Sequence, residues 1–134
     1  MGYLEQAKKQ LTVYEEKQKS IISEIKESYI EDGFDEDEID IDTGIVVDGA
    51  LQWDELRDID YIDDVVSCQE LLVRALEIFE QKNKKSLHNA NKAFETLVHE
   101  ARRIKKDRTE DILQAQNVVD VMTEIIRICD EIRK

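Results

Sequence analysis

Apolar residues recur at three- and four-residue steps over most of this chain, and this repeat constrains the fold more than any other feature. A period near 3.6 residues is typical of helices that bury one face. The 134 residues include no proline and only four glycines, so little interrupts the repeats. We therefore predict a mainly all-α protein, an up-down four-helix bundle that forms a single helical domain over residues 1–134.

The first helix is predicted over residues 3–30. Its apolar residues fall on heptad a and d positions, with Gln18 at one a position, so this long N-terminal helix is coiled-coil-like. Its narrow stripe suits either a seam in a bundle or pairing with a second copy. Three more helices are predicted over 54–81, 86–106 and 109–133. The second half of the 54–81 helix is apolar on most sides, so we expect it to be central.

Polar residues at the expected helix starts are typical of caps. Asp54 or a neighbour would cap the second helix and Ser86 the third, while Asp107 and Glu110 have the spacing of a capping box for the fourth. The short connections make the last three helices antiparallel neighbours.

Residues 31–52 leave the helical period and form a small acidic insert. The first helix should stop at Glu31-Asp32-Gly33, because glycine commonly follows a helix end. Isoleucines then alternate with acids, Thr43-Gly44 can turn, and β-branched residues follow. This pattern favours a β-hairpin between 38–42 and 45–48, packed on neighbouring apolar residues.

Negative charge is concentrated in one stretch. Residues 31–64 hold fifteen acids and one base, Arg57, which is a formal charge of −14 in a chain whose total is −13. The predicted topology gathers this stretch and the five bases within residues 102–108 at one end of the bundle. Five bases cannot neutralise fifteen acids, so we expect a negative pole.

A chain of this charge is a poor direct partner for nucleic acid, whose phosphates are bound by lysine and arginine. A dense array of carboxylates is instead suited to bind a basic surface on another protein. We predict a non-enzymatic protein-binding module or inhibitor that acts as a nucleic-acid mimic, of the kind that small phage and mobile-element proteins often are. The predicted contacts are the acids Asp35, Glu36, Asp37, Glu38, Asp40 and Asp42, with Phe34, Trp53 and Tyr61 as aromatic anchors.

Two alternatives remain open. In the first, the protein is a structural or assembly protein that dimerises through the first helix, and its acids maintain solubility. In the second, Glu24-x-x-Glu27 and Glu55-x-x-Asp58 resemble in outline the magnesium-binding motifs of all-α nucleotide pyrophosphohydrolases. That resemblance implies magnesium-dependent hydrolysis with Glu55 and Asp58 among the metal ligands. However, helical periodicity places Glu24 and Glu27 away from the apolar face of their helix, so we predict no enzyme, cofactor or metal site.

Other features indicate a reduced, cytoplasmic protein. No apolar run is long enough for a membrane span, and the first residues have no apolar leader. Cys68 and Cys129 lack metal-ligand or CxxC spacing, so we expect buried reduced thiols. His88 and His99 belong to no recognisable catalytic motif, and we expect surface or packing roles for both.

Overall fold

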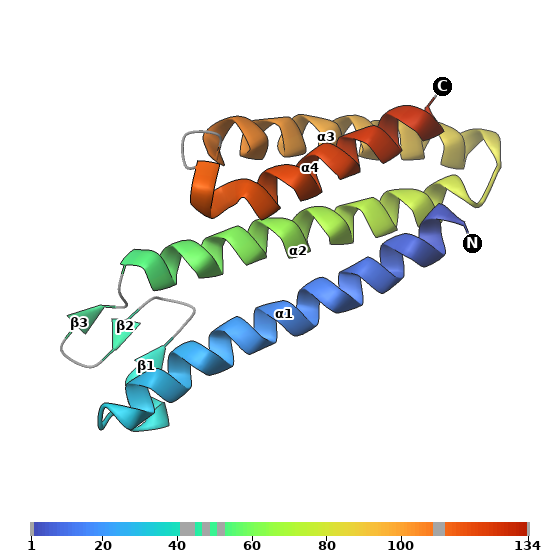
Figure 1. Ribbon diagram of the computed structural model, residues 1–134. Coiled ribbons are helices and arrows are strands. Elements are labelled where there is room, and N and C mark those ends of the chain that lie inside the picture. Colours follow the sequence, from blue (N-terminus) through green and yellow to red (C-terminus); the bar gives the residue numbers. More distant parts are fainter. Residues whose placement is uncertain (1, 41–44, 47–48, 51–52, 109–111, 134) are drawn as a thin grey trace.

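The computed structural model describes residues 2–40, 45–46, 49–50, 53–108 and 112–133, with the backbone alone at 45–46, 49–50, 53–54 and 112–116. Four long helices lie side by side in it, and the predicted up-down bundle is confirmed (Figure 1). The helices are α1 (Tyr3–Glu31), α2 (Trp53–Phe79), α3 (Lys84–Arg108) and α4 (Ile112–Ile132). Between α1 and α2 come a 3-10 turn, η1 (Glu36–Glu38), and the strands β1 (Ile39–Asp40), β2 (Ile45–Val46) and β3 (Gly49–Ala50).

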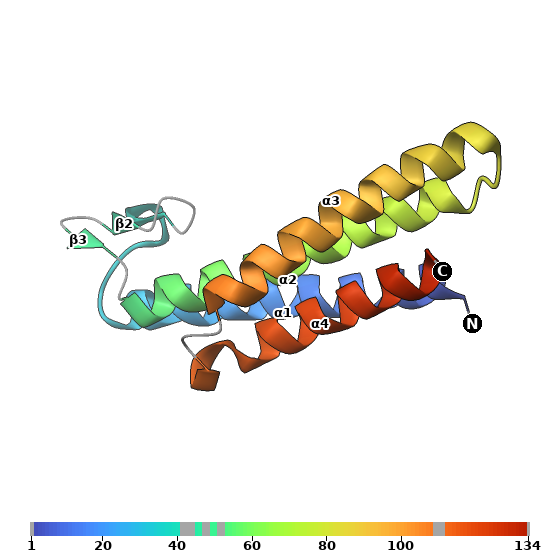
Figure 2. The same ribbon diagram turned by 90° about the horizontal axis from the view of Figure 1, so that it is seen from above.

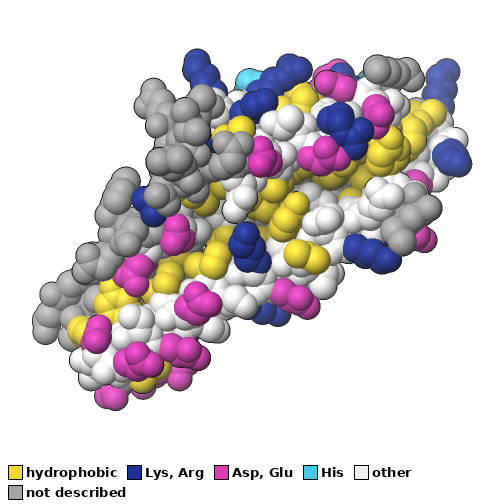
Figure 3. Space-filling view, viewed as in Figure 1, with side chains coloured by type: hydrophobic (Ala, Val, Ile, Leu, Met, Phe, Trp, Pro, Cys, Tyr) yellow, Lys and Arg dark blue, Asp and Glu magenta, His cyan; other side chains and the backbone are white. Residues whose placement is uncertain are grey.

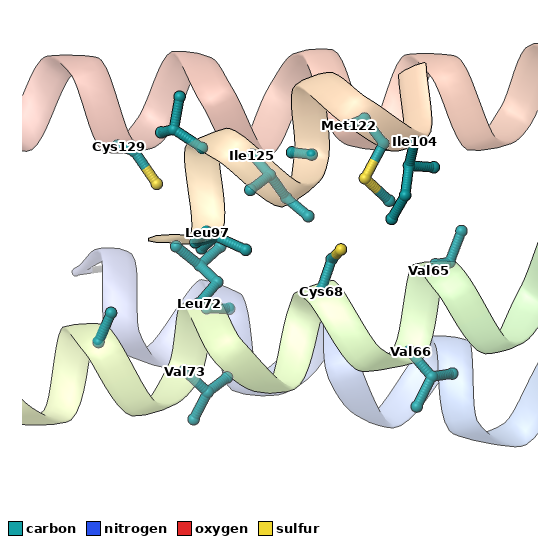
Figure 4. Close-up of a cluster of buried hydrophobic side chains, with 14 of the residues drawn as sticks. Val65, Val66, Cys68, Leu72, Val73, Leu97, Ile104, Met122, Ile125 and Cys129 are labelled. Atoms are coloured by element: carbon teal, nitrogen blue, oxygen red, sulfur yellow. The ribbon is translucent and has the colours of Figure 1, made fainter. Parts of the chain in front are cut away.

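Helix α2 lies at the centre of the bundle and packs against α1, α3 and α4. Side chains from α2, α3 and α4 converge on one core (Figure 4). Its largest fully buried side chains are Phe94, Leu72, Leu97, Met122, Ile125, Cys68 and Cys129. The continuous apolar surface predicted for the second half of α2 is thus covered on several sides at once.

Helix α1 is covered much less completely than the other helices. Only Ala7 and Ile25 are buried among its 29 residues. The polar contacts between α1 and α2 include two made by glutamines: the Gln18 amide donates a hydrogen bond to Asp63 Oδ1 at 2.6 Å, and the buried Gln69 amide donates one to the Ala7 carbonyl at 3.0 Å. Gln18, which interrupts the heptad stripe, therefore has a specific polar partner.

The bundle is open along one side. Helix α4 packs on α3 and α2, whereas α1 and α4 share no comparably extensive contact within the described residues. Viewed from above, α4 diverges from α1 away from the two chain ends (Figure 2). Near those ends the Tyr3 hydroxyl donates a hydrogen bond to Glu131 Oε2 at 2.7 Å.

Two predicted helix starts differ in the structure. Helix α3 begins at Lys84 because Asn83, not Ser86, is its cap: Asn83 Oδ1 accepts from the Ser86 N–H at 2.8 Å, and Ser86 Oγ accepts from the Asn83 N–H at 3.0 Å. The two side chains form a capping box, which adds the preceding residues to the helix. Asp107 likewise lies in the last turn of α3, where Arg103 Nη1 donates to it at 2.9 Å. Glu110 lies outside the described residues.

The start of α2 also differs by one residue from the prediction. Helix α2 begins at Trp53, so Asp54 is its second residue, and the cap position at 52 lies outside the described part of the chain.

The predicted hairpin is present as two short antiparallel strands, with Ile39 opposite Val46 and Asp40 opposite Ile45. The predicted turn at 43–44 lies outside the described residues. A third strand, β3, pairs with β2 through Ala50 and Gly49. The sequence did not predict it, because glycine and alanine have low strand propensity.

We predict that Phe94→Ala lowers the free energy of unfolding by about 3–5 kcal/mol, because it leaves a cavity among three helices. Leu87→Ala on the same helix removes a side chain that is 39% exposed, and should cost less than about 1 kcal/mol. Urea unfolding followed by circular dichroism measures both. Similar losses for the two variants would contradict the described core.

Candidate functional site: the acidic tip

The end of α1 is a defined helix stop that begins the acidic segment. Gly33 has a φ of +104°, a left-handed backbone that favours glycine. Its N–H donates to the Ile30 carbonyl at 3.0 Å, and the Phe34 N–H donates to the Tyr29 carbonyl at 3.1 Å. This is the Schellman pattern, and the Tyr29 and Phe34 rings make its usual apolar contact, edge to face with centroids 5.7 Å apart.

The four acids after Phe34 fold into the compact turn η1. The Asp35 N–H donates to Glu38 Oε1 at 3.2 Å, and the Glu38 N–H donates to the Asp35 carbonyl at 3.0 Å. Carboxylates at the start of a helical turn lie near its free N–H groups, which is favourable for negative charge. The sequence did not predict this turn, which holds Glu36 and Asp37 out on the surface.

A small second core supports this segment. Ile39 of β1, Ile25 of α1 and Ile59 of α2 are buried together, with Phe34 and Leu56 packed against them. The core ties the short strand to two long helices, which an isolated hairpin would need in order to be stable. The acids around it are therefore held at a defined position at the end of the bundle.

Residues 31–40, which we call the acidic tip, hold seven acids and no base. Six of the seven are exposed and Glu38 is half-buried. No described lysine or arginine forms an ion pair with the acids from Glu31 to Glu38. Acidic side chains gather at this end of the molecule, at the lower left of Figure 3.

Several acids within residues 55–64 instead form hydrogen bonds or ion pairs inside the protein. Glu55 Oε1 accepts a hydrogen bond from the Tyr29 hydroxyl at 2.7 Å, and Asp63 accepts from Gln18. Asp58 lies 3.7 Å from Arg57 Nε. Among the described side chains, the densest run of acids that pair with no lysine or arginine therefore lies in the acidic tip, from Glu31 to Glu38.

The basic cluster at the end of α3 reaches the acidic stretch through Arg108. Its guanidinium pairs with Asp64 at 2.9 Å and lies over the Tyr61 ring, 4.6 Å from the centroid. Burial raises the pKa of the Asp64 carboxyl, while the hydrogen bond from Arg108 opposes that shift. Arg103 pairs with Glu100 and Asp107 on its own helix, so part of the cluster is neutralised within α3.

The predicted contact residues separate into two groups. Asp35, Glu36, Asp37, Glu38 and Asp40 lie together in the acidic tip, whereas Asp42 and the side chain of Trp53 lie outside the described part of the chain.

The two described aromatic anchors are used inside the protein. Phe34 is half-buried against Tyr29 and the small second core. Tyr61 is only 8% exposed and belongs to the main core. Its ring therefore faces the inside of the bundle, which leaves little of it exposed as a surface anchor.

The acids of the magnesium alternative do not form a metal cluster. Glu24 and Glu27 are exposed on α1, and Glu55 is occupied by the Tyr29 hydroxyl. Among the described residues, no group of three or more histidine, cysteine or acidic side chains could hold a metal ion.

Comparison with family models, curated proteins and solved structures finds no match to this chain. Within the described residues, no helix combines the length and the apolar character needed to cross a bilayer. A functional proposal therefore has to come from the geometry and charge of the molecule itself.

We predict that Gly33→Ala destabilises the protein by about 1–2 kcal/mol, because an L-residue is strained at this φ. Gly2→Ala is the control: its φ is −76° and its surroundings are open, so the change adds no backbone strain, and the loss of glycine at the N-cap of α1 should cost no more than about 0.5 kcal/mol. Thermal unfolding of the two variants provides the comparison. An unchanged melting temperature for Gly33→Ala would contradict the described helix stop.

The two thiols should be inert in the folded protein. Burial raises the pKa of both Cys68 and Cys129 to about 12, so little thiolate exists near neutral pH. We predict negligible reaction with Ellman's reagent at pH 8 and release of two equivalents after addition of guanidinium chloride. Rapid reaction of either thiol in the native state would show that it is accessible.

Proposed function

We propose that this protein is a non-catalytic binding protein whose acidic tip engages a basic surface on another protein, as an inhibitor or nucleic-acid mimic would. The observation that carries the proposal is the run of exposed carboxylates from Glu31 to Asp37 without a described basic partner. An array of negative charges accelerates association with a positively charged surface and disfavours negatively charged competitors.

The small second core beneath the acidic tip should also favour binding, because it holds the carboxylates in position before a partner docks. A flexible acidic segment loses conformational entropy when it docks, whereas a segment already held by a helix stop and a small core loses less. Phe34 and Ile39 provide that support from inside the protein. Their role in the proposal is to position the carboxylates, not to contact the partner.

The position of the tip suits a large partner. It projects beyond the ends of α3 and α4 and away from both chain ends (Figure 1). A groove that normally accepts nucleic-acid phosphates could therefore receive the tip without contact with the rest of the bundle. The partner is defined by that chemistry: a concave surface rich in lysine and arginine.

We predict that the triple variant Asp35→Asn, Glu36→Gln, Asp37→Asn weakens binding to a fluorescent Lys/Arg-rich peptide by about tenfold or more. Wild-type affinity should also fall steeply between about 50 and 300 mM salt, because exposed charges are screened. Fluorescence anisotropy measures both effects. The triple variant Glu16→Gln, Glu77→Gln, Glu80→Gln removes three exposed acids elsewhere and should bind nearly as well as wild type.

Equal losses in the two triple variants would mean that overall charge, not the tip, is responsible. Affinity that is insensitive to salt would reject a charge-led mechanism. Capture from source cells at low salt, compared between wild type and the tip variant, would then identify the natural partner as a protein retained by wild type alone.

A further inference from the structure

The open side of the bundle contains a long apolar groove, separate from the acidic tip. Two hollows of about 170 and 310 Å³ lie end to end between α1 and α4, with α2 as the floor. Tyr14 and Val121 line both hollows. A band of hydrophobic side chains runs along this face, with charged side chains on either side (Figure 3). We call this feature the α1–α4 groove.

Both walls of the groove carry apolar side chains that the protein covers only in part. Tyr14 and Ile21 of α1 and Val121 and Ile128 of α4 are half-buried and pack against the main core. In a closed four-helix bundle α1 and α4 would cover these side chains for each other. Here the two helices leave that surface available along most of their length.

The two walls differ in charge. At the larger hollow, α1 contributes Lys9 and α4 contributes Glu124. Lys9 forms no ion pair with any described residue. Glu124 pairs with Arg127 on its own helix, and its carboxylate can accept a further donor. A wall with an unpaired base thus faces a wall with an acid, on either side of an apolar floor.

We propose that the α1–α4 groove is a self-association surface, and that its occupant is the same face of a second copy of this chain. A two-fold axis along the groove places α1 of each copy over α4 of the other. Lys9 of each copy then opposes Glu124 of the second copy, and the half-buried apolar side chains meet in the middle. The face is complementary to itself in both charge and hydrophobicity.

The available area is sufficient for a reversible dimer. From Tyr3 to Ile21 the groove is about 27 Å long at 1.5 Å per residue, and two helices make it about 20 Å wide. Two copies would bury about 1,100 Å² in total, near the lower limit for specific interfaces. A single helix of another protein, bound in the groove, would leave part of the apolar walls exposed to water.

The same geometry places both acidic tips at one end of the dimer. They would lie roughly 20 Å apart, which exceeds the Debye length of about 8 Å at physiological salt. Their repulsion should therefore weaken the dimer at about 10 mM salt and matter little at about 150 mM. This is the opposite of the salt dependence expected for binding of a basic partner, so the two proposals can fail separately.

Sedimentation equilibrium of the full chain tests the proposal at about 10 and 150 mM salt. We expect a reversible dimer that tightens at the higher salt. Val121→Asp and Ile128→Asp should each weaken it by at least about 100-fold, because each variant places two charges in the apolar contact. Leu87→Asp, at an exposed leucine on α3, should leave the dimer unchanged. Circular dichroism verifies that each variant is folded.

A charge exchange tests the arrangement of the two copies. Lys9→Glu should weaken the dimer by about tenfold, since the change acts at two symmetric contacts. Lys8→Glu, the neighbouring exposed lysine outside the groove, should have little effect. The double variant Lys9→Glu, Glu124→Lys should restore dimerisation. A monomer at every concentration and salt, a dimer insensitive to Val121→Asp and Ile128→Asp, or no recovery in the double variant would each overturn the proposal.

Discussion

Burial of the apolar surface of α2 is the constraint on which the rest of this structure depends. Helices α3 and α4 close over one part of that surface and form the main core with it. Helix α1 covers another part, but only Ala7 and Ile25 of its own residues become buried. The main core is thus formed by α2, α3 and α4, and α1 packs on one side of it. The open groove and the acidic tip therefore both lie along α1.

The long elements could be predicted from the sequence because their apolar residues follow one period for many turns. The hairpin was predictable from Ile39 and the β-branched residues at 45–47, which alternate or cluster as strand residues do. The start of α3 was not, because Asn83 and Ser86 are both good caps and only their mutual hydrogen bonds distinguish them. The sequence alone predicts the first residue of a helix only when one candidate cap is clearly favoured over the others.

The candidate site was predictable in its charge but not in its side-chain directions. Seven acids without a base in residues 31–40 are visible in the sequence. The inward position of Tyr61, and the way Asp63 and Asp64 are engaged, depend on which face of α2 meets each neighbour. The groove was also missed. Its signal was present as Val121 and Ile128, apolar residues in excess of what one buried face of α4 requires.

The hydrogen bonds from Gln18 to Asp63 and from Tyr29 to Glu55 fix the register of α1 on α2. Apolar side chains on α1 would tolerate a slide by one helical turn, about 5.4 Å, since one leucine or isoleucine can replace another. A slide of that size would separate both side-chain pairs, at a cost of about 1 kcal/mol or more for each hydrogen bond. These two contacts therefore determine how far the acidic tip extends past the other helices.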